Sequence, residues 1–197
     1  MIDLAVPGLD TVAVPESAEA GRERFRSLLL SWLPDLTAER LDLLSEGITA
    51  FRERLTSGGW VYHGVAGGPP NEHVDLPTSW HYLAAVGPAP ADEPRELLLA
   101  HLLGWSRLPD GVTPTSLDTR MDGGLGFHAD VRQGAVLRGV EPDPATADQP
   151  FGLAAYVAVD ASRARALLVV GMSLLPGTTA TMASLAALMA QRSTFRD

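Results

Sequence analysis

Five polar residues in the middle of the chain have the types and spacing from which a binding or catalytic site could be built. A carboxylate beside a histidine can orient the imidazole as a general base, and an arginine can clamp a carboxylate or a phosphate. The same pattern also suits the solvent face of any antiparallel strand pair, where charges of alternating sign are common. We therefore treat these residues as candidate binding residues and assign no catalytic residue. They are Asp118, Arg120, His128, Asp130 and Arg132.

The side chains around these residues alternate between polar and apolar, which is typical of strands with one buried and one wet face. The pattern predicts one strand over residues 115–122 and a second over residues 125–132. A connection of three or five residues would place Arg120 opposite His128 and keep the apolar residues of both strands on one face. This register would gather the candidate binding residues on the other face.

Histidine is the other residue type that could support chemistry. None of the five histidines has the spacing of an H-x-x-x-H or H-E-x-x-H metal motif. His63 and His81 could meet diagonally across a strand hairpin, with Glu72 and His73 on its tip. Two interpretations stay open, a metal site and a pair of imidazoles packed among aromatic side chains, and we favour the second.

Composition excludes several further classes of chemistry. Every basic residue is Arg, so a Walker A loop would lack its Lys, and G-x-G-x-x-G does not occur. The absence of Cys removes thiolate catalysis, disulfides and Cys-based metal sites. Neither the segment 104–108 nor 171–175 has the second glycine of the serine-hydrolase G-x-S-x-G turn. Without these motifs we expect no cofactor. The net charge of −9 disfavours nucleic acid and anionic membranes, so we expect neither as a partner.

The elements that must position these residues begin with two amphipathic helices behind an N-terminal arm or edge strand. The first helix starts at Glu16 or Ser17 and stops before Pro34, and the second runs over Ala38–Leu55 behind the cap residue Thr37. The two read as an αα-hairpin. The core side of the second helix is expected to carry Leu41, Leu44, Ile48, Phe51 and Leu55.

Strands are expected at Trp60–Ala66 and Trp80–Gly87, followed by a third helix at Arg95–Trp105 and a short strand at Val136–Val140. The first two strands carry an aromatic ladder that most often forms core under helices, although an open face of this kind would bind a protein or peptide. The ladder consists of Trp60, Tyr62, Trp80 and Tyr82. The apolar side of the third helix is expected to carry Leu97, Leu98, His101, Leu102 and Trp105.

The C-terminal quarter has the strongest hydrophobic pattern of the chain. It predicts strands at Leu153–Val159 and Arg165–Leu174, a turn between them, and a helix from Thr178 or Thr179 to about Gln191. Residues 166–191 are uncharged, but a Pro-Gly turn interrupts them, so we disfavour a membrane span here.

The order of these C-terminal elements resembles a family of uncharacterised actinobacterial proteins. Residues 155–160 and 166–170 resemble its strand hairpin, and a final helix is closed by the aromatic-basic tail at residues 193–196. The family is similar to the Mog1/PsbP-like α/β sandwich, and some members are associated with type VII secretion loci. The resemblance implies an antiparallel sheet covered by helices and an accessory or partner-binding role, and it transfers no functional residue.

Together these observations predict one cytoplasmic α+β domain over residues 1–197, with an arm and helical hairpin at 1–58 and a sheet with covering helices at 59–197. The sheet should be mainly antiparallel, with about five to seven strands. We expect a non-catalytic protein-binding or accessory protein with a protein partner or a second copy of itself. The alternative is a small hydrolase or metal-dependent enzyme that uses the strand-borne His and Asp residues.

Overall fold

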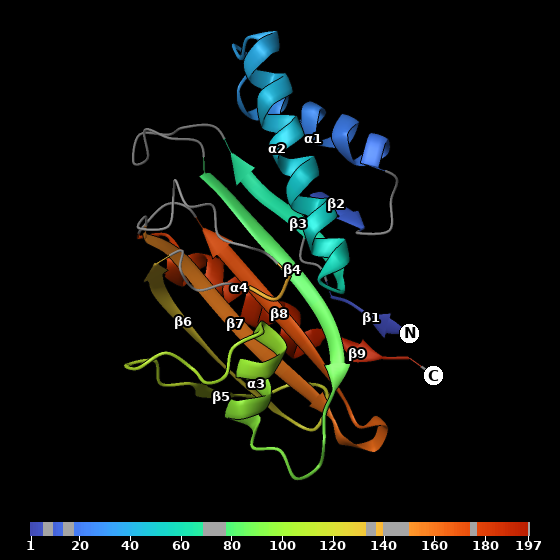
Figure 1. Cartoon of the computed structure of the whole chain (residues 1–197), viewed down its shortest axis with the longest axis vertical. Helices are drawn as coiled ribbons and strands as arrows, with labels where there is room; N and C mark the ends of the chain where they lie inside the picture. Colours follow the sequence, from blue (N-terminus) through green and yellow to red (C-terminus); the bar gives the residue numbers. More distant parts are fainter. Residues whose placement is uncertain are drawn as a thin grey trace.

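A seven-stranded sheet forms the centre of the structure, and every pair of neighbouring strands in it is antiparallel (Figure 1). The computed structural model describes residues 1–5, 10–13, 18–68, 78–132, 137–139, 150–173 and 177–196. The expected α+β fold with an antiparallel sheet of five to seven strands and an N-terminal helical hairpin is confirmed. Across the sheet the strands are β2 (Asp10–Ala13), β3 (Trp60–Gly68), β4 (Thr78–Pro88), β8 (Arg165–Ser173), β7 (Pro150–Asp160), β6 (Gly124–Arg132) and β5 (Thr115–Leu117).

The two C-terminal strands β7 and β8 lie in the middle of this sheet, and almost all of their residues are buried. A strand covered on both faces needs a nearly continuous apolar sequence, which explains the hydrophobic run of this quarter. Asp160 stabilises the turn between them, because its carboxylate accepts hydrogen bonds from the Ser162 hydroxyl and the Arg163 backbone N–H. The predicted hairpin and turn are confirmed.

Helices cover both faces of the sheet (Figure 1). On one face lies α4 (Thr179–Arg192), whose Met182, Ala186 and Met189 are buried against the sheet. On the other face lies α3 (Arg95–Leu103), which ends at Gly104 in the left-handed conformation that glycine favours.

The predicted apolar side of α3 was right for Leu98, Leu102 and Trp105 and wrong for Leu97 and His101. Leu97 is exposed to 37%, and His101 lies on the solvent side, where its ring contacts Glu93. Helix α3 contains two runs of leucine, so two neighbouring stripes along it are almost equally apolar. The stripe that packs on the sheet is the one that leaves His101 exposed to water. The residues that pack on the sheet are Leu98, Leu99, Leu102 and Leu103.

The N-terminal helices α1 (Ala18–Trp32) and α2 (Ala38–Ser57) form the expected hairpin at one end of the molecule (Figure 1). Thr37 caps α2 by accepting a hydrogen bond from the Arg40 backbone N–H, as predicted. Arg26 of α1 and Asp42 of α2 form an ion pair between the helices. The predicted core position Leu44 is wrong, since 42% of it is exposed: only the C-terminal part of α2 lies against the sheet, so Leu44 has no sheet to pack on.

The aromatic ladder is core, as predicted, but it divides between the two faces. A register shift between Trp60 and Tyr62 in β3 turns Trp60 toward the α3 side, whereas Tyr62, Trp80 and Tyr82 lie on the α4 side. Trp60 also donates a hydrogen bond from its indole N–H to the Arg138 carbonyl at 3.0 Å.

A second, two-stranded sheet joins the chain ends, where β1 (Ile2–Asp3) pairs with β9 (Thr194–Phe195). Several expectations fall outside the described residues, namely the loop with Glu72 and His73, the acidic loop at residues 141–149, and all of the Val136–Val140 strand except residues 137–139. Among the described helices, none combines the length and the apolar character that crossing a membrane requires.

Candidate functional site

The register predicted for the central strand pair was wrong, so the structure does not gather the five candidate binding residues. Strand β5 has only three residues and pairs Thr115 with Gly126 and Leu117 with Gly124. Asp118 and Arg120 therefore lie in the connection after β5, and Arg120 is not opposite His128. This connection is bonded to α4 instead, because the Arg120 backbone N–H donates to the Gln191 carbonyl at 2.9 Å. Local strand periodicity gives no signal of this contact.

The remaining candidates occupy β6, where each has a different environment. His128 is exposed to solvent, and Asp130 accepts a hydrogen bond of 2.6 Å from the Thr179 hydroxyl in the first turn of α4. Arg132 ends the strand, and its side chain lies outside the described residues. Asp130 thus helps to fix the start of α4, and the binding role of the five residues stays a prediction.

The predicted meeting of His63 and His81 does occur. His63 pairs with Leu83 and His81 with Val65, so the histidines lie diagonally across β3 and β4. Their rings are stacked at a centroid distance of 5.3 Å, and His63 Nε2 lies 3.0 Å from His81 Nδ1. One of these two nitrogens must donate a proton and the other must accept it.

Two phenylalanines from the helical hairpin enclose this imidazole pair. Phe25 of α1 and Phe51 of α2 lie 5.7 and 5.5 Å from the His63 ring, and His63 is completely buried. Burial lowers the pKa of His63 well below its ordinary value, and the neighbouring His81 and the Arg52 guanidinium lower it further. Burial also lowers the pKa of His81 from 6.5 to about 4. Both rings are therefore neutral near pH 7, and protonation of either would place a charge under the helices.

The histidine pair is better suited to holding the hairpin on the sheet than to catalysis. His63 Nδ1 is buried and has no hydrogen-bond partner in the described part of the chain. Within the same ranges, no group of three or more His, Cys, Asp or Glu residues is arranged to hold a metal ion. The interpretation of imidazoles packed among aromatic rings agrees with these contacts.

An open, mainly apolar surface lies at the turn between α1 and α2. A hollow of about 540 Å³, here called the tip hollow, is lined there mainly by apolar side chains. Leu44 in its wall is 42% exposed, and Leu43, the residue before it in α2, is 70% exposed. The residues of the tip hollow are Trp32, Leu33, Pro34, Asp35, Leu36, Arg40 and Leu44.

Sequence reasoning missed this surface because it assigned Leu44 to the core. A signal was present, since Leu43 and Leu44 are adjacent on a helix and point about 100° apart, so a narrow buried stripe cannot include both. The turn sequence around Pro34 also places further apolar side chains beyond the end of α1.

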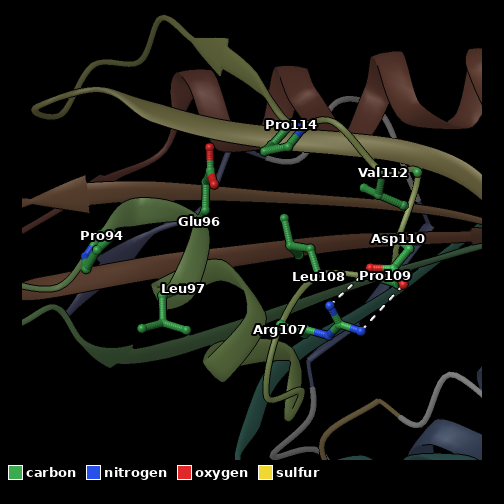
Figure 2. Close-up of a pocket in the computed structure, with 10 residues that line it drawn as sticks. Pro94, Glu96, Leu97, Arg107, Leu108, Pro109, Asp110, Val112 and Pro114 are labelled. Carbon is green, nitrogen blue, oxygen red and sulfur yellow. Dashed lines mark hydrogen bonds and ion pairs between the residues drawn. The ribbon is translucent and has the colours of Figure 1, made fainter.

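A second hollow of about 430 Å³ lies beside α3 (Figure 2). Arg107 and Asp110 form an ion pair with each other at its rim, with an Nη1–Oδ1 distance of 3.1 Å. The third charged side chain of this hollow, Glu96, forms no ion pair in the described part of the chain.

Comparisons with known proteins add no relative to this description. A scan against protein-family models found no match, and neither did searches of curated proteins and of solved structures.

Proposed function

We propose that this chain is a non-catalytic protein-binding or accessory protein that binds its partner through the tip hollow. The observation that carries the proposal is the open apolar surface at the end of the helical hairpin, with exposed Leu44 in its wall and exposed Leu43 next to Leu44 in α2. Contiguous exposed apolar surface with a polar rim is typical of protein interaction sites.

The energetic argument starts from these two leucines. Complete burial of a leucine side chain contributes about 1.5–3 kcal/mol relative to leaving it in water. A partner that covers both leucines would gain much of that amount from each, in the central, water-excluding part of an interface.

The arrangement of the molecule supports the same surface. Helices α3 and α4 cover the two faces of the sheet, and the aromatic ladder is mostly buried, so it does not offer an open face. The hairpin tip lies at the end of the molecule away from α3 and β5, where a partner can approach it (Figure 1).

The enzymatic alternative lacks a comparable observation. His63 is completely buried beneath Phe25 and Phe51, and Asp130 is bonded to Thr179. A link to secretion remains part of the proposal and rests only on the resemblance of the C-terminal elements.

Affinity capture with chemical crosslinking and quantitative mass spectrometry tests the proposal. The tagged wild type is compared with Leu44→Arg and with the matched control Leu97→Arg, which places the same charge on another exposed helical leucine. Arg120→Ala tests the central polar residues in parallel, and circular dichroism checks that each variant is folded.

We expect one protein, in stoichiometric amount, to be captured by the wild type, Leu97→Arg and Arg120→Ala and lost from Leu44→Arg. Loss from Arg120→Ala alone would move the binding surface to the central strands. Equal capture by all four proteins, or no capture at all, would contradict binding through the tip hollow.

A further inference from the structure

The tip hollow and its rim have the chemistry to bind a second copy of themselves. We propose that two copies of this chain form a symmetric dimer by packing their α1–α2 hairpins against each other at the tip hollow. This inference rests on the proposed function and specifies the partner as the chain itself.

The charges of the hollow give the first argument. Asp35 and Arg40 both line the hollow and are both exposed. In the described part of the chain neither forms an ion pair. In a two-fold interface, residue i of one copy meets residue j of the other, and the reverse contact also forms. Asp35 can therefore pair with Arg40 of the second copy, and the symmetry produces this pair twice.

The distribution of net charge gives the second argument. Residues 18–57 contain six Arg and seven Asp or Glu, a net charge of −1, whereas the whole chain carries −9. The other residues therefore carry −8 in sum. Like-charged surfaces oppose association, and the hairpin, which is almost neutral, adds little opposition of its own.

The shape of α2 gives the third argument. Leu43 is exposed and precedes Leu44 of the hollow wall in α2, so it is available to contact the hollow of a second copy while its own hollow receives the equivalent leucine. One turn further on, Gly47 is exposed, and a β-carbon there would meet no atom of this chain within 4 Å. This open space allows another helix to approach closely.

The size of the hairpin is adequate for such an interface. Helices of 15 and 20 residues are about 22 and 30 Å long, and helices pack about 10 Å apart. The hairpin therefore offers a face of roughly 500 Å² in projection, the same order as the about 800 Å² of accessible surface that each partner buries in a specific interface.

Sedimentation velocity of the purified full-length chain from about 1 to 200 µM tests the inference. We expect a monomer–dimer equilibrium for the wild type and at least about tenfold weaker dimerisation for Asp35→Arg and for Arg40→Asp, because each substitution creates two like-charge contacts. The double variant Asp35→Arg/Arg40→Asp should dimerise again. An equimolar mixture of the two single variants should form a heterodimer, since their altered surfaces are complementary to each other.

A wild type that stays monomeric at every concentration would overturn the dimer. A dimer that neither single variant weakens, or that mixing the single variants does not restore, would overturn the Asp35–Arg40 pairing. If the wild type is monomeric but captures a different protein in a Leu44-dependent way, only this inference fails and the proposed function stands. If the wild type is monomeric and captures nothing, both fail.

Discussion

Acidification should weaken the fold because burial keeps the paired imidazoles of His63 and His81 neutral at pH values where the unfolded chain binds protons on both. In the unfolded chain both rings bind protons with the ordinary histidine pKa of about 6.5. In the folded chain burial lowers the pKa of His81 to about 4 and that of His63 in the same direction. The unfolded state therefore binds more protons between pH 6.5 and 4, and the free energy of unfolding falls as the pH falls through this range.

The size of the effect follows from the two sites. Each imidazole contributes a slope of up to about 1.4 kcal/mol per pH unit, so the pair contributes up to about 2.7 kcal/mol per unit. For His81 alone, the shift from 6.5 to about 4 corresponds to about 3 kcal/mol over the whole range. Since domains of this kind are stable by about 5–15 kcal/mol, a large part of the stability should be lost near pH 5.

Urea unfolding followed by tryptophan fluorescence at several values of pH between 7.5 and 4.5 measures this slope. The double variant His63→Leu/His81→Leu removes both imidazoles and should flatten the slope between pH 6.5 and 5, whereas His128→Gln, at an exposed position of β6, should keep the wild-type slope. Identical slopes for the wild type and the double variant would refute the assignment of the acid sensitivity to this pair. Should the double variant not fold, NMR titration of the wild-type imidazoles gives the answer, and a pKa near 6.5 for both would contradict the reasoning.

Two further predictions concern stability and use thermal or urea unfolding. A Gly→Ala substitution should change the free energy of unfolding in opposite directions at two sites. Gly47→Ala should raise it by about 0.5–1 kcal/mol, because alanine favours a helix more than glycine does and the added carbon meets no atom. Gly126→Ala should lower the free energy of unfolding by about 1–3 kcal/mol, because the added carbon would collide with the Tyr156 ring and a backbone carbonyl. Equal effects of the two substitutions would contradict the packing described for β6 and β7. Leu55→Ala should cost about 2–5 kcal/mol, because Leu55 is completely buried where α2 meets the sheet, while Leu43→Ala should change stability by less than about 0.5 kcal/mol. A small effect at Leu55 would mean that α2 is not anchored there.

Local sequence patterns predicted the C-terminal half of the sheet well, since both its hydrophobic runs and its breaks are unambiguous. The strand from Pro150 to Asp160 and its partner from Arg165 to Ser173 are buried on both faces, and Asp160 marks the turn through its short, hydrogen-bonding side chain. These features act over a few residues, so they can be read without knowing the rest of the fold.

The errors arose where a distant element decided the outcome. Periodicity extended the strand before Gly123 because it cannot show that Arg120 bonds to the far end of α4. It placed Leu44 in the core because a stripe does not reveal how far the sheet extends beneath α2. The first error led us to expect five binding residues on one face, and the second hid the tip hollow. Both errors concern positions that tertiary contacts decide.

Thiol accessibility at the tip hollow tests the central claim most directly, since the chain has no cysteine of its own. Leu44→Cys introduces one reporter in the hollow, and Leu97→Cys introduces a matched reporter on α3. Modification by a small maleimide is followed in dilute purified protein and inside the source cells. If a protein covers the tip hollow, Leu44→Cys should react several-fold more slowly in cells relative to Leu97→Cys than it does in dilute solution. An unchanged ratio of the two rates would show that the hollow stays open in cells and would contradict its role as a protein-binding surface.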